Sequence, residues 1–136
     1  MTDDFDWGFG LTEADLRFVD EFLERRNAIR KAEIPLSRLI SRWNRFVAEI
    51  GTYLYEEYAN ECNGREILGS ELIDVAPPRL RSAILEAVSG ADEAYLQKTL
   101  PVRKPWWRVH DERYRWLYQR CPERWVWYRE HGIPSR

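Results

Sequence analysis

Apolar residues recur at every third or fourth position along the first half of the chain, which is the spacing of amphipathic helices. The first helix is predicted from residue 12 to about residue 32, with Thr12 as its N-cap and Asp15 in a capping-box position. The second is predicted to open after Pro35 and to end at the Asn63–Gly64 pair, which makes it about 25 residues long. We expect these two helices to pack as an antiparallel pair that forms the frame of the domain.

The middle of the chain has a less regular pattern. Residues 65–78 mix apolar residues with glycine and end in two prolines, so we expect a loop with one short helical turn. Residues 78–88 have the pattern of a short helix that opens at the prolines and breaks at Ser89–Gly90. Residues 91–100 then form another short helix before Pro101.

The C-terminal segment, residues 103–136, allows two interpretations. Asp111 can cap a helix to about residue 120, and Cys121–Pro122 can open a second one. Aromatic residues also favour strands, so residues 114–118 and 125–128 could instead pair as a β-hairpin. We favour the helices, because start and stop signals fit at both ends and a lone hairpin needs a surface to pack on.

The predicted fold is therefore an all-α small helical bundle, built on the long antiparallel pair and completed by short C-terminal helices. Residues 1–11 are expected to form an acidic, aromatic N-terminal arm, and residues 12–136 a single helical domain.

The composition is that of one small globular domain. The chain has 136 residues, of which 44% are hydrophobic and 32% are charged, and such a chain can bury about two-thirds of its unfolded surface. No apolar run approaches the roughly 20 residues that span a bilayer, and the acidic start does not resemble a secretory signal. We expect a cytoplasmic, bacterial protein without a membrane segment, in which Cys62 and Cys121 are free thiols.

The sequence carries no motif of a cofactor or metal site. It lacks glycine-rich phosphate loops and the His and Cys spacings that bind zinc, so we predict no cofactor and no metal ion. Cys121 could pair with His110 or His131 as a nucleophile, and Glu57 could act as a buried general base. A helix-capping cysteine and a solvated glutamate are more common for such residues, so we expect no enzymatic activity.

Charge and aromatic residues both concentrate in residues 103–136. The net charge is −2, yet this segment has nine bases against four acids, and it contains five of the seven tryptophans. The tryptophans could be core residues, or they could form a protein-binding surface together with the arginines. Because neighbouring side chains point in different directions, one of Trp106 and Trp107 should be exposed. The candidate binding residues are Trp106, Trp107, Arg108, Arg113, Arg115, Arg120, Arg124 and Trp127.

These patterns predict a non-enzymatic module that binds another protein through the C-terminal segment, as an adaptor, an inhibitor or an immunity-type partner. The acidic arm is complementary in charge to this segment, so it could dock on a second subunit and produce a homodimer. The alternative is a nucleic-acid-binding regulator that uses the same basic, aromatic segment. A small hydrolase or nuclease that uses Glu57 or His131 is the third interpretation.

Overall fold

The computed structural model describes residues 11–31, 33–53 and 55–123. In these residues helices dominate and the strands are a single pair of two residues each, so the predicted all-α class is confirmed. Of the predicted features, most of the N-terminal arm and the end of the C-terminal segment, with Arg124, Trp127 and His131, lie outside the described residues.

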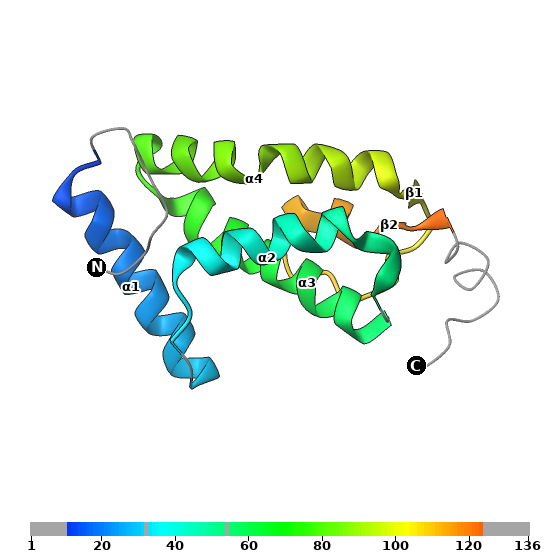
Figure 1. Ribbon diagram of the computed structural model, residues 1–136, viewed down its shortest axis with the longest axis horizontal. Coiled ribbons are helices and arrows are strands. Elements are labelled where there is room, and N and C mark those ends of the chain that lie inside the picture. The colour runs from blue at the N-terminus through cyan, green and yellow to red at the C-terminus, as the bar shows by residue number, and fades with distance from the viewer. Residues whose placement is uncertain (1–10, 32, 54, 124–136) are drawn as a thin grey trace.

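Three helices form the bundle: α2 (Leu36–Ala48), α3 (Tyr55–Ile67) and α4 (Pro78–Lys98). Figure 1 shows α2 and α4 running in the same direction, with α3 returning on the side of α2 away from α4, and α1 (Glu13–Arg30) crossing one end of the bundle at a steep angle. The capping box predicted for α1 is present, because the side chain of Asp15 accepts from the backbone of Thr12 and the hydroxyl of Thr12 accepts from Asp15.

The single long helix predicted after Pro35 is wrong. Helix α2 ends at Ala48, the 3₁₀ turn η1 (Ile50–Thr52) reverses the chain, and α3 runs back along α2. Gly51 is a poor helix former, and the reversal lets the ring of Phe46 pack on Tyr58 at 4.9 Å between ring centroids. The antiparallel pair thus forms inside the stretch for which one helix was predicted.

The loop predicted for residues 65–78 and the break predicted at Ser89–Gly90 are also wrong. Helix α3 continues to Ile67, a π-helical turn η2 (Leu68–Leu72) follows, and the 3₁₀ turn η3 (Ile73–Val75) leads to α4. The chain stays helical there because its apolar side chains are buried, and α4 runs unbroken through Gly90 between buried side chains of the same helix. Burial outweighs the local preference of glycine in both places.

In the described part of the C-terminal segment, neither the predicted α-helix from Asp111 to residue 120 nor the predicted hairpin strand is present. Asp111 does cap a helix, but this is the short 3₁₀ helix η4 (Glu112–Leu117) rather than an α-helix to residue 120. Residues 114–118 therefore form no hairpin strand. Cys121 ends strand β2, and the chain is helical at Glu123, directly after Pro122, as predicted; the remainder of this predicted helix lies outside the described residues. Strand β1 (Leu100–Pro101) pairs antiparallel with β2 (Arg120–Cys121), which holds residues 120–121 of the segment against the chain that follows α4.

The core of the bundle is unusually aromatic for its size. The rings of Tyr58 and Tyr95 are fully buried where α3 and α4 meet, and their hydroxyl oxygens lie 3.1 Å apart. The hydroxyl of Tyr95 also donates to the carbonyl of Leu117, which joins the C-terminal segment to the core. None of the described helices has the length and apolar character needed to cross a membrane.

Candidate functional site

The two adjacent tryptophans of the C-terminal segment differ in burial. Trp106 is only 3% exposed, its ring packs on Tyr58 at 5.2 Å, and its indole N–H donates to the carbonyl of Arg120 at 2.7 Å. Trp107 is half-buried rather than exposed, and its ring centroid lies 6.4 Å from that of Trp106. Trp106 therefore belongs to the core, and Trp107 is the ring that remains partly accessible.

Two candidate arginines of this segment, Arg113 and Arg115, form ion pairs within the chain. Arg113 pairs with Asp111 at 2.6 Å and with Asp74 at 3.0 Å. The bond from Arg113 holds the pKa of the Asp111 carboxyl below its usual range. Arg115 pairs with Glu112 at 2.8 Å, and this bond likewise lowers the pKa of the Glu112 carboxyl. These arginines fix the shape of the segment, so a partner would have to compete for them.

Arg120 and Arg108 are placed differently from each other. The guanidinium of Arg120 donates to the hydroxyl of Thr99 at 2.9 Å and to the carbonyls of Leu96 and Thr99, which satisfies the C-terminal end of α4. Arg108 is exposed, and within the described residues no hydrogen bond or ion pair holds its side chain. Arg108 with Trp107 is therefore the part of the predicted surface that stays accessible.

Among the described residues, those considered for catalysis are not assembled into a site, while His131 lies outside the described residues. Glu57 is exposed on α3, and His110 is exposed before η4. Cys121 is fully buried in β2, where a substrate could not reach its sulfur. In the part of the chain that the structure describes, no group of His, Cys, Asp or Glu side chains is arranged to hold a metal ion.

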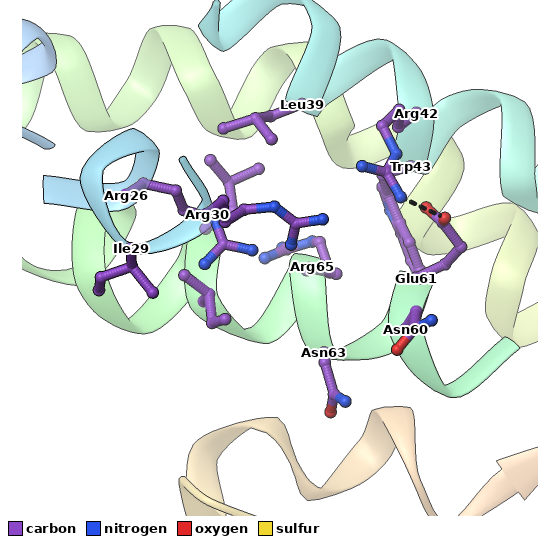
Figure 2. A pocket seen from close by; sticks show the side chains of 13 residues that line it. Arg26, Ile29, Arg30, Leu39, Arg42, Trp43, Asn60, Glu61, Asn63 and Arg65 are labelled. Atoms are coloured by element: carbon purple, nitrogen blue, oxygen red, sulfur yellow. Dashed lines mark hydrogen bonds and ion pairs between the residues drawn. The ribbon is translucent and has the colours of Figure 1, made fainter. Parts of the chain in front are cut away.

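A cavity of about 350 Å³ lies between α1 and the α2–α3 pair (Figure 2). Its charged lining residues, among those the structure describes, are four arginines and one carboxylate: Arg26, Arg30, Arg42, Arg65 and Glu61. We call this feature the arginine cavity. This concentration of positive charge around a hollow was not predicted.

Helix α1 contributes two of these arginines. Arg26 and Arg30 are four residues apart and therefore lie on one face of the helix, and Figure 2 shows both extending into the cavity. Burial lowers the pKa of Arg26, and the nearby charge of Arg30 lowers it further, while Glu71 acts in the opposite direction. Among the described residues, no ion pair or hydrogen bond to another side chain compensates either guanidinium.

The α2–α3 pair contributes the other two arginines, and both are paired. Arg42 donates to Glu61 at 2.7 Å across the helix pair. Arg65 donates from Nε and Nη2 to the carboxylate of Asp92 on α4, at 3.0 and 2.7 Å. The same carboxylate accepts from the indole N–H of Trp43 at 2.8 Å, so all three helices of the bundle meet at this contact.

Arg65 is unusual because it is charged and only 4% exposed. Its guanidinium carbon lies 5.7 and 5.9 Å from the ring centroids of Tyr114 and Trp116, which adds cation-π attraction. Its third nitrogen, Nη1, is buried and makes no hydrogen bond of good geometry to any residue that the structure describes, although Arg65 lies close enough to the Tyr114 hydroxyl to lower the pKa of that group. An unsatisfied buried donor costs about 1–3 kcal/mol, so this atom is the least satisfied polar group described in the cavity wall.

Apolar side chains complete the wall of the arginine cavity. Leu39 of α2 and Ile67 of α3 line it, and Ile29 reaches it from α1 while remaining 79% exposed. The cavity thus offers positive charge beside apolar surface. A ligand with acidic and apolar groups in alternation would match both features.

Part of this site was readable in the sequence. The spacing of Arg26 and Arg30 on a predicted amphipathic helix places them on one face. Arg42 and Arg65 join them only because α3 folds back along α2, and a continuous helix would have kept these two residues far apart.

Comparison of the chain with protein-family models, with curated proteins and with solved structures gives no match.

Proposed function

We propose that this protein is a non-enzymatic binding module that recognises an acidic segment of another protein in the arginine cavity. The observation that carries the proposal is the charge of the lining, four arginines against one carboxylate among the described residues. Opposite charges across an interface speed association and select the partner. Two of the four arginines, Arg26 and Arg30, have no compensating carboxylate in the described part of the chain and are available to a ligand.

The apolar part of the lining favours a polypeptide over a nucleic acid. Ile29, Leu39 and Ile67 give a ligand surface on which to bury aliphatic or aromatic side chains. Single-stranded nucleic acid binds through stacking on aromatic rings, and Trp43, the aromatic residue in the lining, is 2% exposed. An acidic peptide with interspersed apolar residues uses both properties of the cavity.

Trp107 and Arg108 remain proposed as a second contact surface for the same partner. Their accessibility supports this role, since the neighbouring arginines are held in ion pairs within the chain. Self-association into a homodimer also stays a prediction, and sedimentation of the purified protein measures it directly.

The test is a binding titration with a fluorescent peptide that alternates glutamate and leucine. We expect saturable binding, measured by fluorescence anisotropy, that becomes about tenfold weaker or more in Arg26→Ala/Arg30→Ala, because each charge-assisted hydrogen bond contributes about 1.5–3 kcal/mol. The matched control is Arg17→Ala/Arg25→Ala, which removes two exposed charges from the same helix outside the cavity. Equal losses of peptide affinity in both variants would mean that binding depends only on the overall charge of the protein.

A second titration separates protein binding from nucleic-acid binding. A single-stranded oligothymidylate of the same net charge as the peptide should bind more weakly and lose its affinity steeply with salt. Tighter binding of the oligonucleotide, with dependence on Arg26 and Arg30, would assign the cavity to nucleic acid instead.

A further inference from the structure

We propose that Arg26, Arg30 and Arg65 together bind a phosphate monoester group inside the arginine cavity. The inference rests on the proposed function and deepens it, because it names the chemical group that the cavity selects. Its support comes from three independent features: the uncompensated charge, the unsatisfied nitrogen of Arg65 and the arrangement of the guanidinium groups.

The charge that remains after internal pairing is the first feature. Arg42 is paired with Glu61, and Arg65 is paired with Asp92. Counting the described residues alone, Arg26 and Arg30 are left with two positive charges, and Glu71 acts on Arg26 without forming an ion pair. A group with two negative charges balances this excess, and a phosphate monoester carries nearly two at neutral pH. A single carboxylate would leave one positive charge uncompensated.

The buried guanidinium of Arg65 is the second feature. Its Nε and Nη2 are held by Asp92, which orients the group, while Nη1 makes no hydrogen bond of good geometry within the described part of the chain. A buried donor without a good hydrogen bond is costly, and a ligand oxygen that reaches Nη1 would supply the missing bond. Figure 2 shows the Arg65 side chain extending from α3 toward Arg26 and Arg30.

The arrangement of the guanidinium groups is the third feature. Arg26 and Arg30 approach the cavity from one helix and Arg65 approaches from another, so a ligand would be held from two sides. Guanidinium forks match the oxygens of phosphate through paired N–H donors, and a phosphate monoester offers three terminal oxygens to three arginines. Two carboxylate oxygens cannot serve three arginines equally well.

The direct test is calorimetric titration of the full-length protein with phenyl phosphate, with sodium acetate as the carboxylate comparison. We expect saturable binding of phenyl phosphate and about tenfold weaker binding or more in Arg26→Ala/Arg30→Ala. The control Arg17→Ala/Arg25→Ala should bind as the wild-type protein does. Acetate binding as tight as that of phenyl phosphate, or equal losses in the two variants, would overturn the inference.

Arg65 is tested without mutation first, because replacing a buried arginine can prevent folding. In a ¹⁵N-labelled wild-type protein, the Nε–H signal of Arg65 should shift progressively with phenyl phosphate and saturate at the calorimetric affinity. Arg65→Lys, which keeps the charge and loses the fork, should bind about tenfold more weakly if its circular dichroism is native. An Arg65 signal that stays unchanged while phenyl phosphate binds would remove this residue from the site.

Two further titrations identify the source of the phosphate and separate this inference from the proposed function. A glutamate–leucine peptide with one phosphoserine should bind more tightly than phenyl phosphate if the group belongs to a partner protein. Equal affinities would assign the site to a small phosphate ester. If the unphosphorylated peptide binds through Arg26 and Arg30 while phenyl phosphate does not bind, the proposed function stands and the phosphate inference fails.

Discussion

The carboxylate of Asp92 balances the buried positive charge of Arg65 inside the bundle. Its carboxylate accepts from the indole of Trp43 and from two nitrogens of Arg65, and Arg65 has almost no contact with water. A buried charge that loses its partner destabilises a protein strongly, because the lost attraction is not replaced by hydration. Asp92 therefore contributes both to the stability of the fold and to the orientation of Arg65 in the arginine cavity.

We accordingly predict that Asp92→Ala lowers the free energy of unfolding by about 3 kcal/mol or more, measured by urea denaturation. Glu93→Ala is the matched control, since Glu93 is the next residue and is exposed, and it should change stability by less than about 0.5 kcal/mol. Similar values for the two variants would show that the Arg65–Asp92 pair is open to water in solution.

The cysteines give a second prediction at this scale. Cys62 and Cys121 are both fully buried, and burial raises the pKa of the Cys62 thiol well above its usual range. Only the thiolate reacts with iodoacetamide, so the native protein should be alkylated at least about a hundredfold more slowly than the protein in urea. Mass spectrometry of the two time courses checks this, and rapid alkylation of the native protein would contradict the described packing.

At the scale of elements, the ends of helices follow from local chemistry while their continuity follows from packing. Thr12 and Asp15 predicted the start of α1, Pro35 predicted the start of α2, and the Pro77–Pro78 pair predicted the start of α4. Glycine disfavours a helix equally at positions 51, 64 and 90. Yet α2 ends just before Gly51, whereas α3 continues through Gly64 and α4 continues through Gly90. Glycine costs a helix about 1 kcal/mol, which the burial of a few neighbouring apolar side chains outweighs.

The candidate site was predictable only in part for the same reason. The sequence places Arg26 and Arg30 on one helical face, but nothing local brings Arg42 and Arg65 to them. The aromatic and basic composition of the C-terminal segment was the stronger local signal, and the structure uses much of it internally, with Trp106 in the core and Arg120 at the end of α4. Composition shows which residues are concentrated, whereas tertiary contacts decide which of them are available.

Two glycines test the packing of the helices. An added Cβ at Gly69 would overlap the ring of Tyr114, whereas one at Gly90 meets no atom within 4 Å. We predict that Gly69→Ala destabilises the protein by about 1–3 kcal/mol through overpacking, and that Gly90→Ala stabilises it by about 0.5–1 kcal/mol by raising helix propensity. Thermal melts of both variants measure the two effects. Gly69→Ala with unchanged stability would mean that η4 is not docked against η2 in solution.

For the whole molecule, the question is whether the accessible part of the C-terminal segment and the arginine cavity work together. Trp107 and Arg108 follow β1, whereas Arg26 and Arg30 lie near the end of α1. A partner that contacts both must be larger than the cavity, and a short acidic peptide that fills the cavity need not reach the other surface.

We therefore predict that Trp107→Ala/Arg108→Ala leaves the affinity for the glutamate–leucine peptide within about twofold of wild type, because these residues do not line the cavity. The variant should lose about 1 kcal/mol of stability, since Trp107 is half-buried against Trp106. Anisotropy titrations and thermal melts measure the two quantities. A tenfold loss of peptide affinity would instead mean that the peptide contacts both surfaces, which would then form one binding site.

The attachment of the C-terminal segment to α3 has a consequence for the order of folding. The hydroxyl of Tyr118 lies 2.7 Å from a carboxylate oxygen of Glu66 and 2.6 Å from the amide oxygen of Asn63, contacts between residues 52 and 55 positions apart in sequence. Contacts of such separation form late, because a long loop must close before they contribute. The α2–α3 pair, whose contacts are local, should therefore form early, and Tyr118→Phe should speed unfolding while leaving the folding rate nearly unchanged.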